Sequence, residues 1–170
     1  MELEDRISLA VDFFRQGYNC AQSVTAAFAD LYGLTHDQAL RVSASFGGGV
    51  GRMRGICGAA SGMFILAGLE CGSVEAHDPK GKEYNYSIVQ QLAAKFKERN
   101  GSLICGELLG LVPLGSSGMT VPPHGDSPVP EARTEGYYKK RPCAGMVEEG
   151  ARIFVEYLLN KQGVGAINVK

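Results

Sequence analysis

Cysteine is the residue type in this chain best suited to chemistry, because a thiolate can attack a disulfide or bind a metal ion. The five cysteines are Cys20, Cys57, Cys71, Cys105 and Cys143. They are all far apart in the sequence, so there is no CxxC motif and no zinc-ribbon or ferredoxin spacing. Spacing alone therefore gives only a weak indication of a metal site.

Four of the cysteines share a local context that is typical of the start of a helix. These contexts are Asn19-Cys20, Cys57-Gly58, Cys105-Gly106 and Pro142-Cys143. The unpaired N–H groups and the positive dipole at a helix start lower a thiol pKa and favour the thiolate. Cys71 is the exception, because it falls at the C-terminal end of the helix that Cys57 begins. The positions thus separate four cysteines that could share one site from a fifth that could not.

The alternative for each cysteine is a purely structural role. Free cysteine is among the most buried residue types and behaves as a small hydrophobe. That interpretation is the better one for any single cysteine, whereas four predicted helix starts together favour chemistry.

The central segment of the chain, Gly47 to Cys71, joins a glycine-rich loop to an apolar stretch. Residues Gly58 to Leu69 carry no charge, which predicts a helix buried among others, although the stretch is too short to span a membrane. Gly58 and Gly62 lie one turn apart on one helix face, so another backbone or a ligand could approach closely there.

The loop from Gly47 to Gly55 holds five glycines and two arginines, Arg52 and Arg54. Its N–H groups could bind a phosphate or another anion, and the arginine charges could support this or favour a nearby thiolate. The loop matches neither a P-loop nor a Rossmann fingerprint. These mismatches favour the alternative, a turn that leads the chain into the buried helix.

Hydrophobic periodicity predicts an all-α fold with helices over about 3–14, 20–31, 35–46, 58–69, 82–100, 102–109 and 143–159. Residues 113–136 contain five prolines and four glycines, which exclude a regular helix, and a connection this long is typical of a lid, a binding loop or a disordered segment. Residues 161–170 are expected to fray, and 166–169 is the only weak strand candidate. The sequence predicts one domain over 1–170, a compact bundle of about six or seven short helices around a buried central helix.

The composition excludes some classes of partner. The chain has 170 residues and a net charge of −1, with 45% hydrophobic and 21% charged residues, which gives no support for nucleic-acid or membrane-surface binding. No signal peptide is recognisable, so we expect a cytoplasmic protein with reduced thiols. The three histidines, at positions 36, 77 and 124, have no metal-ligand spacing with a cysteine.

Four sequence blocks, in order, resemble the bacterial C_GCAxxG_C_C family. The blocks are Asn19-Cys20-Ala21-Gln22-Ser23-Val24, Cys57-Gly58-Ala59-Ala60-Ser61-Gly62, Cys105-Gly106-Glu107-Leu108-Leu109-Gly110 and Pro142-Cys143. The resemblance covers roughly Ile7 to Leu158. It implies redox activity carried by the four cysteines of the blocks, with Cys71 as an extra one, and genes that often lie near transporter genes. The chain departs from the family label, GCAxxG, by reading Cys57-Gly58-Ala59, and its proline-rich segment looks like an expansion.

Three hypotheses follow. In the first, Cys20, Cys57, Cys105 and Cys143 exchange electrons with a thiol or electron-transfer partner, and Cys57 is the attacking thiolate. In the second, the same four thiolates hold zinc or an iron–sulfur cluster, since four cysteines suit both.

The third hypothesis is a non-enzymatic accessory protein of a transporter, whose cysteines belong to the core. In the first two hypotheses, a ligand or cofactor would lie against Arg52, Arg54, Gly58 and Gly62. The sequence leaves open whether the chain forms a homo-oligomer.

Overall fold

A computed structural model describes residues 1–120 and 126–167, with side chains as far as Gly163. In chain order the elements are α1 (Asp5–Arg15), α2 (Cys20–Ala26), η1 (Ala29–Tyr32), α3 (His36–Ser43), η2 (Ala44–Phe46), α4 (Gly47–Val50), α5 (Gly58–Cys71), α6 (Pro79–Asn100), α7 (Cys105–Leu108), α8 (Glu135–Lys140) and α9 (Cys143–Ile167), where η marks a 3-10 helix. Within the described residues the only β-type pairing is a bridge between Ile56 and Ile104. The predicted all-α fold is confirmed.

Side-chain caps fix where several helices begin. At the start of α2 the Asn19 side chain accepts a hydrogen bond from the Gln22 N–H at 2.9 Å, and the Gln22 side chain accepts one from the Asn19 N–H at 3.1 Å. Thr35 and Gln38 form the same reciprocal box at the start of α3. Such boxes satisfy N–H groups that the helix itself leaves unpaired. The cap at Asn19 is the one that the sequence predicts, and it places Cys20 at the first position of its helix.

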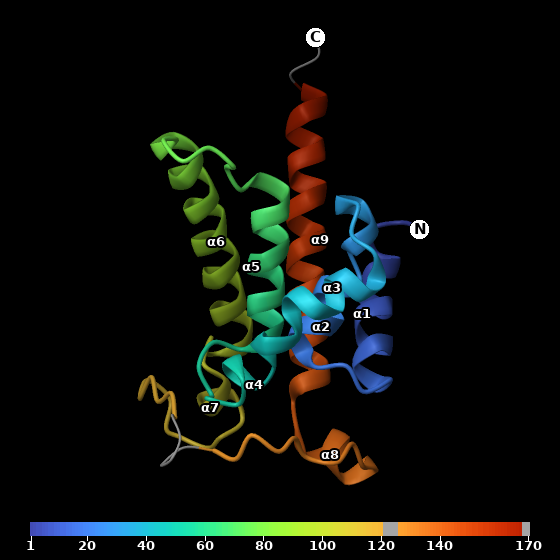
Figure 1. Cartoon of the computed structure of the whole chain (residues 1–170), viewed down its shortest axis with the longest axis vertical. Helices are drawn as coiled ribbons and strands as arrows, with labels where there is room; N and C mark the ends of the chain where they lie inside the picture. The colour runs from blue at the N-terminus through green and yellow to red at the C-terminus, as the bar shows by residue number, and fades with distance from the viewer. Residues whose placement is uncertain (121–125, 168–170) are drawn as a thin grey trace.

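Helix α5 is the centre of the bundle, as predicted. It packs against α2, α6 and α9, and α1 packs against α2 and α9; α5, α6 and α9 run side by side in Figure 1. Met63 and Leu66 of α5 are fully buried, whereas Leu69 near its end is 41% exposed. The apolar stretch is therefore buried over its first half and reaches the surface at its end.

The two glycines on one face of α5, Gly58 and Gly62, allow helix α2 to pack close to the α5 backbone. A Cβ on Gly62 would lie 2.9 Å from the Val24 Cβ, and a Cβ on Gly58 would lie 3.1 Å from the Cys20 Cβ and from the Ala21 nitrogen. Real side chains do not tolerate such approaches without movement. The close approach that the sequence predicts is thus made by α2 rather than by a ligand.

The chain departs from the predicted elements at several boundaries. The stretch predicted as one helix over 20–31 is divided into α2 and η1, and α8 is not predicted at all, because it is short and follows the proline-rich segment. Helix α9 continues to Ile167, since no proline interrupts it after Asn160, so the predicted fraying tail is helical through residue 167. Residues 168–170 lie outside the described part, as do residues 121–125 of the proline-rich segment. No described helix is both long and apolar enough to cross a membrane.

The contact between α5 and α2 gives a matched pair of substitutions. We expect Gly62→Ala to lower the free energy of unfolding by about 1–3 kcal/mol, because overpacking outweighs the gain in helix propensity. Gly68→Ala, in the same helix with no atom within 4 Å of its would-be Cβ, is expected to raise it by about 0.5–1 kcal/mol. Urea unfolding measures both, and a stabilising Gly62→Ala would contradict the packing described.

Candidate functional site

One cavity of about 390 Å³ is lined by Cys20, Cys57, Cys105 and Cys143. These are the four cysteines that the sequence analysis separates from Cys71. Cys20, Cys105 and Cys143 are the first residues of α2, α7 and α9, and Cys57 directly precedes α5. The helix-start prediction is therefore confirmed for each of them. The starts of α5 and α9 and the whole of α7 lie toward the lower end of the bundle in Figure 1.

Cys71 lies away from this cavity, at the opposite end of α5. Its thiol donates to the Ala67 carbonyl oxygen at 3.2 Å and accepts from the Asn85 side-chain amide at 3.4 Å. The predicted division of the cysteines into four and one is thus confirmed by position. All five thiols are free.

A short antiparallel pairing brings Cys57 and Cys105 together. The Cys57 N–H donates to the Leu103 carbonyl at 2.7 Å, and the Cys105 N–H donates to the Gly55 carbonyl at 2.6 Å. Both cysteines therefore flank the Ile56–Ile104 bridge. Because side chains alternate along extended backbone, Cys57 and Cys105 point to the same face of the pairing.

The glycine-rich loop is a left-handed turn. The φ angles of Gly48, Gly49, Val50, Gly51 and Arg52 are 65°, 70°, 64°, 57° and 64°. Three glycines adopt this conformation without strain, whereas the β-branched Val50 adopts it at a cost in free energy. The sequence left two interpretations of this loop open, an anion site and a simple turn. The structure shows a turn with a strained, left-handed backbone.

The N–H groups at the end of this loop are already used inside the protein. Those of Gly51, Arg52, Arg54 and Gly55 donate to loop carbonyls or to that of Ser45, at 2.8–3.4 Å. They are therefore not available to an anion, and the backbone-cradle hypothesis has no support over these residues. The loop positions Cys105 instead, because a Cβ on Gly49 would lie 2.6 Å from the Cys105 Cβ.

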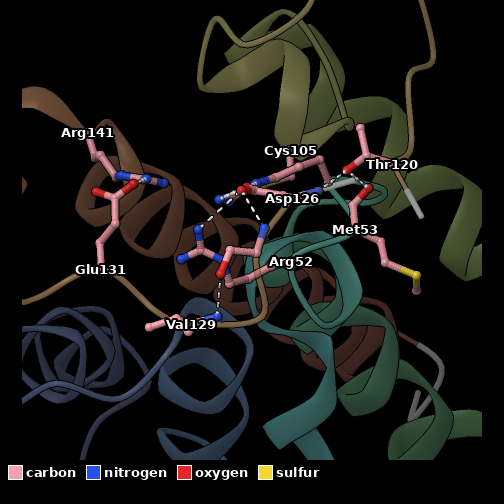
Figure 2. A network of polar contacts seen from close by, with 10 residues as sticks. Arg52, Met53, Cys105, Thr120, Asp126, Val129, Glu131 and Arg141 are labelled. Carbon is pink, nitrogen blue, oxygen red and sulfur yellow. Dashed lines mark hydrogen bonds and ion pairs between the residues drawn. The ribbon is translucent and has the colours of Figure 1, made fainter. Parts of the chain in front are cut away.

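The two arginines of the loop contact a carboxylate that the sequence analysis missed, and one of them also contacts Cys105. The Arg54 Nη1 lies 3.7 Å from the Cys105 Sγ, and its Nη2 lies 2.6 Å from the Asp126 carboxylate. Arg52 pairs with the same carboxylate at 3.5 Å, and Figure 2 shows this network. The Arg54 guanidinium holds the pKa of Asp126 below its usual range.

Of the residues predicted to contact a ligand, Arg52, Arg54 and Gly58 line the cavity. Gly62 is not among the lining residues, because its face of α5 is filled by Val24 and Ala21. Its prediction as a ligand contact is therefore not supported.

Residues 128–133 of the proline-rich segment lie against the cavity, a position compatible with one of the predicted roles of that segment, a binding loop. Pro128, Pro130, Glu131 and Arg133 all line the cavity. Glu131 forms an ion pair with Arg141, which Figure 2 shows apart from the Asp126 network. This irregular stretch of chain thus brings Glu131 and Arg133 close to cysteines that are remote from it in the sequence.

Sequence reasoning missed Asp126, Glu131, Arg133, Tyr137 and Arg141 as parts of the site. Only Arg141 carried a usable signal, since it stands two residues before Cys143. Glu131 and Arg133 line the cavity from an irregular segment, and Tyr137 does so from the short helix α8 that follows it. Asp126 contacts Arg52 and Arg54 from outside the lining, and no periodicity encodes any of these positions.

Burial and local charge give the four cavity thiols different pKa values. Burial raises the pKa of Cys57 to about 12, although the Ala59 and Ala60 N–H groups act in the opposite direction. Burial also raises the pKa of Cys105, and the Arg54 guanidinium offsets part of that effect. A position at a helix start is thus not sufficient to favour the thiolate.

Cys143 is the thiol with the lowered pKa, about 7. The largest cause is the neighbouring Cys20 thiol, and the positive charges of Arg141 and Arg133 add to it. The pKa of Cys20 is correspondingly raised, because Cys20 retains the proton of the pair. Among the four cavity thiols, Cys143 is therefore the one whose thiolate form is favoured. The raised pKa of Cys57 gives no support to its predicted role as the attacking thiolate.

The arrangement does not fit a metal site. In the part of the chain that the structure describes, which includes all five cysteines, no three His, Cys, Asp or Glu side chains converge closely enough to hold a metal ion. A structural zinc ion needs four such ligands at about 2.0–2.3 Å. The zinc and iron–sulfur hypotheses therefore gain no support from this geometry.

Comparisons with known proteins identify the family and nothing narrower. Neither a search of curated proteins nor a search of solved structures found a match. The model of one family, described as "Putative redox-active protein (C_GCAxxG_C_C)", matches residues 18–157, a span that contains all four cavity cysteines. The chain therefore belongs to the C_GCAxxG_C_C family.

Proposed function

We propose that the protein is a thiol–disulfide redox protein in which Cys143 attacks and Cys20 resolves. The observation that carries the proposal is that Cys20 and Cys143, the first residues of α2 and α9, line one cavity together with Arg133 and Arg141. The positive charges of these two arginines favour the Cys143 thiolate. Both cysteines line the cavity, so a substrate there can reach them. The proposal agrees with the redox character of the family.

The reaction needs two displacement steps. The Cys143 thiolate attacks one sulfur of a substrate disulfide, forms a mixed disulfide and expels the other substrate sulfur as a thiolate. Cys20 then loses its proton to solvent and attacks the Cys143 sulfur, which releases the second substrate thiolate. The substrate disulfide is reduced by two electrons, and the two protein thiols are oxidised to one disulfide.

The surroundings of Cys143 match the requirements of this chemistry. An attacking thiol works best when its pKa lies near the ambient pH, since a much lower pKa reduces its nucleophilicity. Arg133 and Arg141 favour the Cys143 thiolate that makes the first attack. Cys57 and Cys105, whose pKa values are raised by burial, remain protonated under the same conditions.

The thiols should differ in their pH dependence. We expect alkylation of Cys143 by iodoacetamide to follow a titration with a midpoint of about 7, because only the thiolate reacts. Below that pH Cys143 is protonated and its alkylation slows, whereas Cys57 stays unalkylated up to about pH 9. Peptide mass spectrometry of samples quenched at each pH measures the sites separately. Faster alkylation of Cys57 than of Cys143 would contradict the assignment.

Redox cycling should require Cys20 and Cys143 but not Cys71. We expect mild oxidation of the native protein to remove two reactive thiols as one intramolecular disulfide, and dithiothreitol to restore them. Cys71→Ser should behave like the native protein, whereas Cys20→Ser and Cys143→Ser should not form this disulfide. Thiol counting with intact-mass measurement follows the change. Unaltered cycling in Cys20→Ser and in Cys143→Ser would overturn the proposed function.

A further inference from the structure

The wall of the cysteine cavity is rich in positive charge. Arg52, Arg54, Arg133 and Arg141 line it, and Glu131 is the only carboxylate among the lining residues that the structure describes. Asp126 contacts two of these arginines from outside the lining, and Glu131 pairs with Arg141. Four guanidinium groups thus face two carboxylates, which leaves a net positive charge around the sulfur atoms.

Arg133 is the arginine whose charge is not neutralised. Its guanidinium donates to the carbonyl oxygens of Phe14 at 3.3 Å and Tyr18 at 3.0 Å. It also stacks over the rings of Phe14 at 4.4 Å and Tyr137 at 4.8 Å. In the described part of the chain no carboxylate pairs with it.

These contacts orient the Arg133 guanidinium without using its full capacity. A guanidinium carries five N–H donors in a planar fork that matches a carboxylate. Two carbonyl oxygens and two aromatic rings fix its position, so binding an anion would cost little side-chain entropy. A preorganised and unpaired cation beside an attacking thiolate is suited to orienting an anionic substrate.

We propose that the substrate is a small disulfide whose substituents carry carboxylate groups, and that Arg133 binds one of these carboxylates while Cys143 attacks. The inference rests on the proposed function and specifies its substrate class. The size follows from the cavity, since about 390 Å³ is within the range of small-molecule sites. The charge follows from the excess of arginine over carboxylate in the wall.

Arg133 acts here as a binding and orienting residue, and the electrons move as in the proposed reaction. The Cys143 thiolate forms a bond to the nearer substrate sulfur, and the bond between the two substrate sulfurs breaks. One carboxylate-bearing thiolate leaves at this step, and the second leaves when Cys20 displaces it. The carboxylates themselves neither gain nor lose a proton or an electron.

Three small disulfides of similar size test the charge preference: anionic 3,3′-dithiodipropionate, neutral 2-hydroxyethyl disulfide and cationic cystamine. The reduced protein is mixed with each, and the rate of mixed-disulfide formation at Cys143 is measured by mass spectrometry in Cys20→Ser, which traps that species. Each rate is divided by the rate of the same disulfide with free 2-mercaptoethanol, which removes intrinsic reactivity. We expect the anionic probe to exceed the neutral one by about tenfold and cystamine to react slowest.

Substitutions at Arg133 separate binding from activation of the thiolate. In the Cys20→Ser background, Arg133→Gln should reduce the anionic-to-neutral ratio to near unity, whereas Arg133→Lys should retain part of it. Any change in the Cys143 pKa alters both rates alike and so leaves the ratio unchanged. Arg152→Gln, on the exposed face of α9, is the matched control and should keep the preference. Added salt should weaken the preference for the anionic probe in the protein with native Arg133. This measurement tests the charge effect even if the Arg133 variants fold poorly.

The outcomes distinguish this inference from the function on which it rests. Equal normalised rates for all three probes, with mixed disulfides still forming at Cys143, would overturn the inference and leave the redox function intact. A protein disulfide, such as those of insulin, that reacts faster than every small probe would also overturn it. Failure of every disulfide to react at Cys143 would instead overturn the proposed function.

Discussion

The site depends on one constraint, the backbone-to-backbone contact between α5 and α2. Gly58 and Gly62 let α2 approach α5 so closely that a Cβ on either glycine would collide with it. This contact sets Cys20 beside the start of α5, which Cys57 directly precedes. The remaining cavity cysteines, Cys105 and Cys143, begin α7 and α9. The four cysteines share one site only if α2 and α5 keep their close contact.

Charge and burial, rather than helix position, distinguish the cysteines of the cavity. All four stand at helix starts, yet the pKa of Cys57 is raised and that of Cys143 is lowered. At Cys57 burial destabilises the thiolate by more than two backbone N–H groups stabilise it, so the pKa rises. Cys143 differs because a neighbouring thiol and several arginines lie close to its sulfur. The irregular segment supplies part of this environment, so the covering loop and the chemistry are linked.

The sequence was sufficient for the fold class, for the positions of four cysteines at helix starts and for the division of the cysteines into four and one. Apolar spacing, the Asn19 cap and the Gly58–Gly62 face are local features, and local features can be read from a sequence. It was not sufficient for the pKa values of the thiols. The burial of Cys57 depends on tertiary packing, and the approach of Arg133 to Cys143 depends on the path of a segment without periodicity. The glycine-rich loop shows the same limit, since its left-handed geometry, its internal hydrogen bonds and its close approach to Cys105 are features of the three-dimensional structure.

The identity of the disulfide formed on oxidation tests the central claim most directly. The protein would be treated with one equivalent of an oxidised small disulfide, alkylated at low pH to prevent exchange, digested and mapped by tandem mass spectrometry. The account predicts a single intramolecular link between Cys20 and Cys143, with Cys57, Cys71 and Cys105 recovered as alkylated thiols. A first link that joins Cys57 to Cys105, or that includes Cys71, would contradict it.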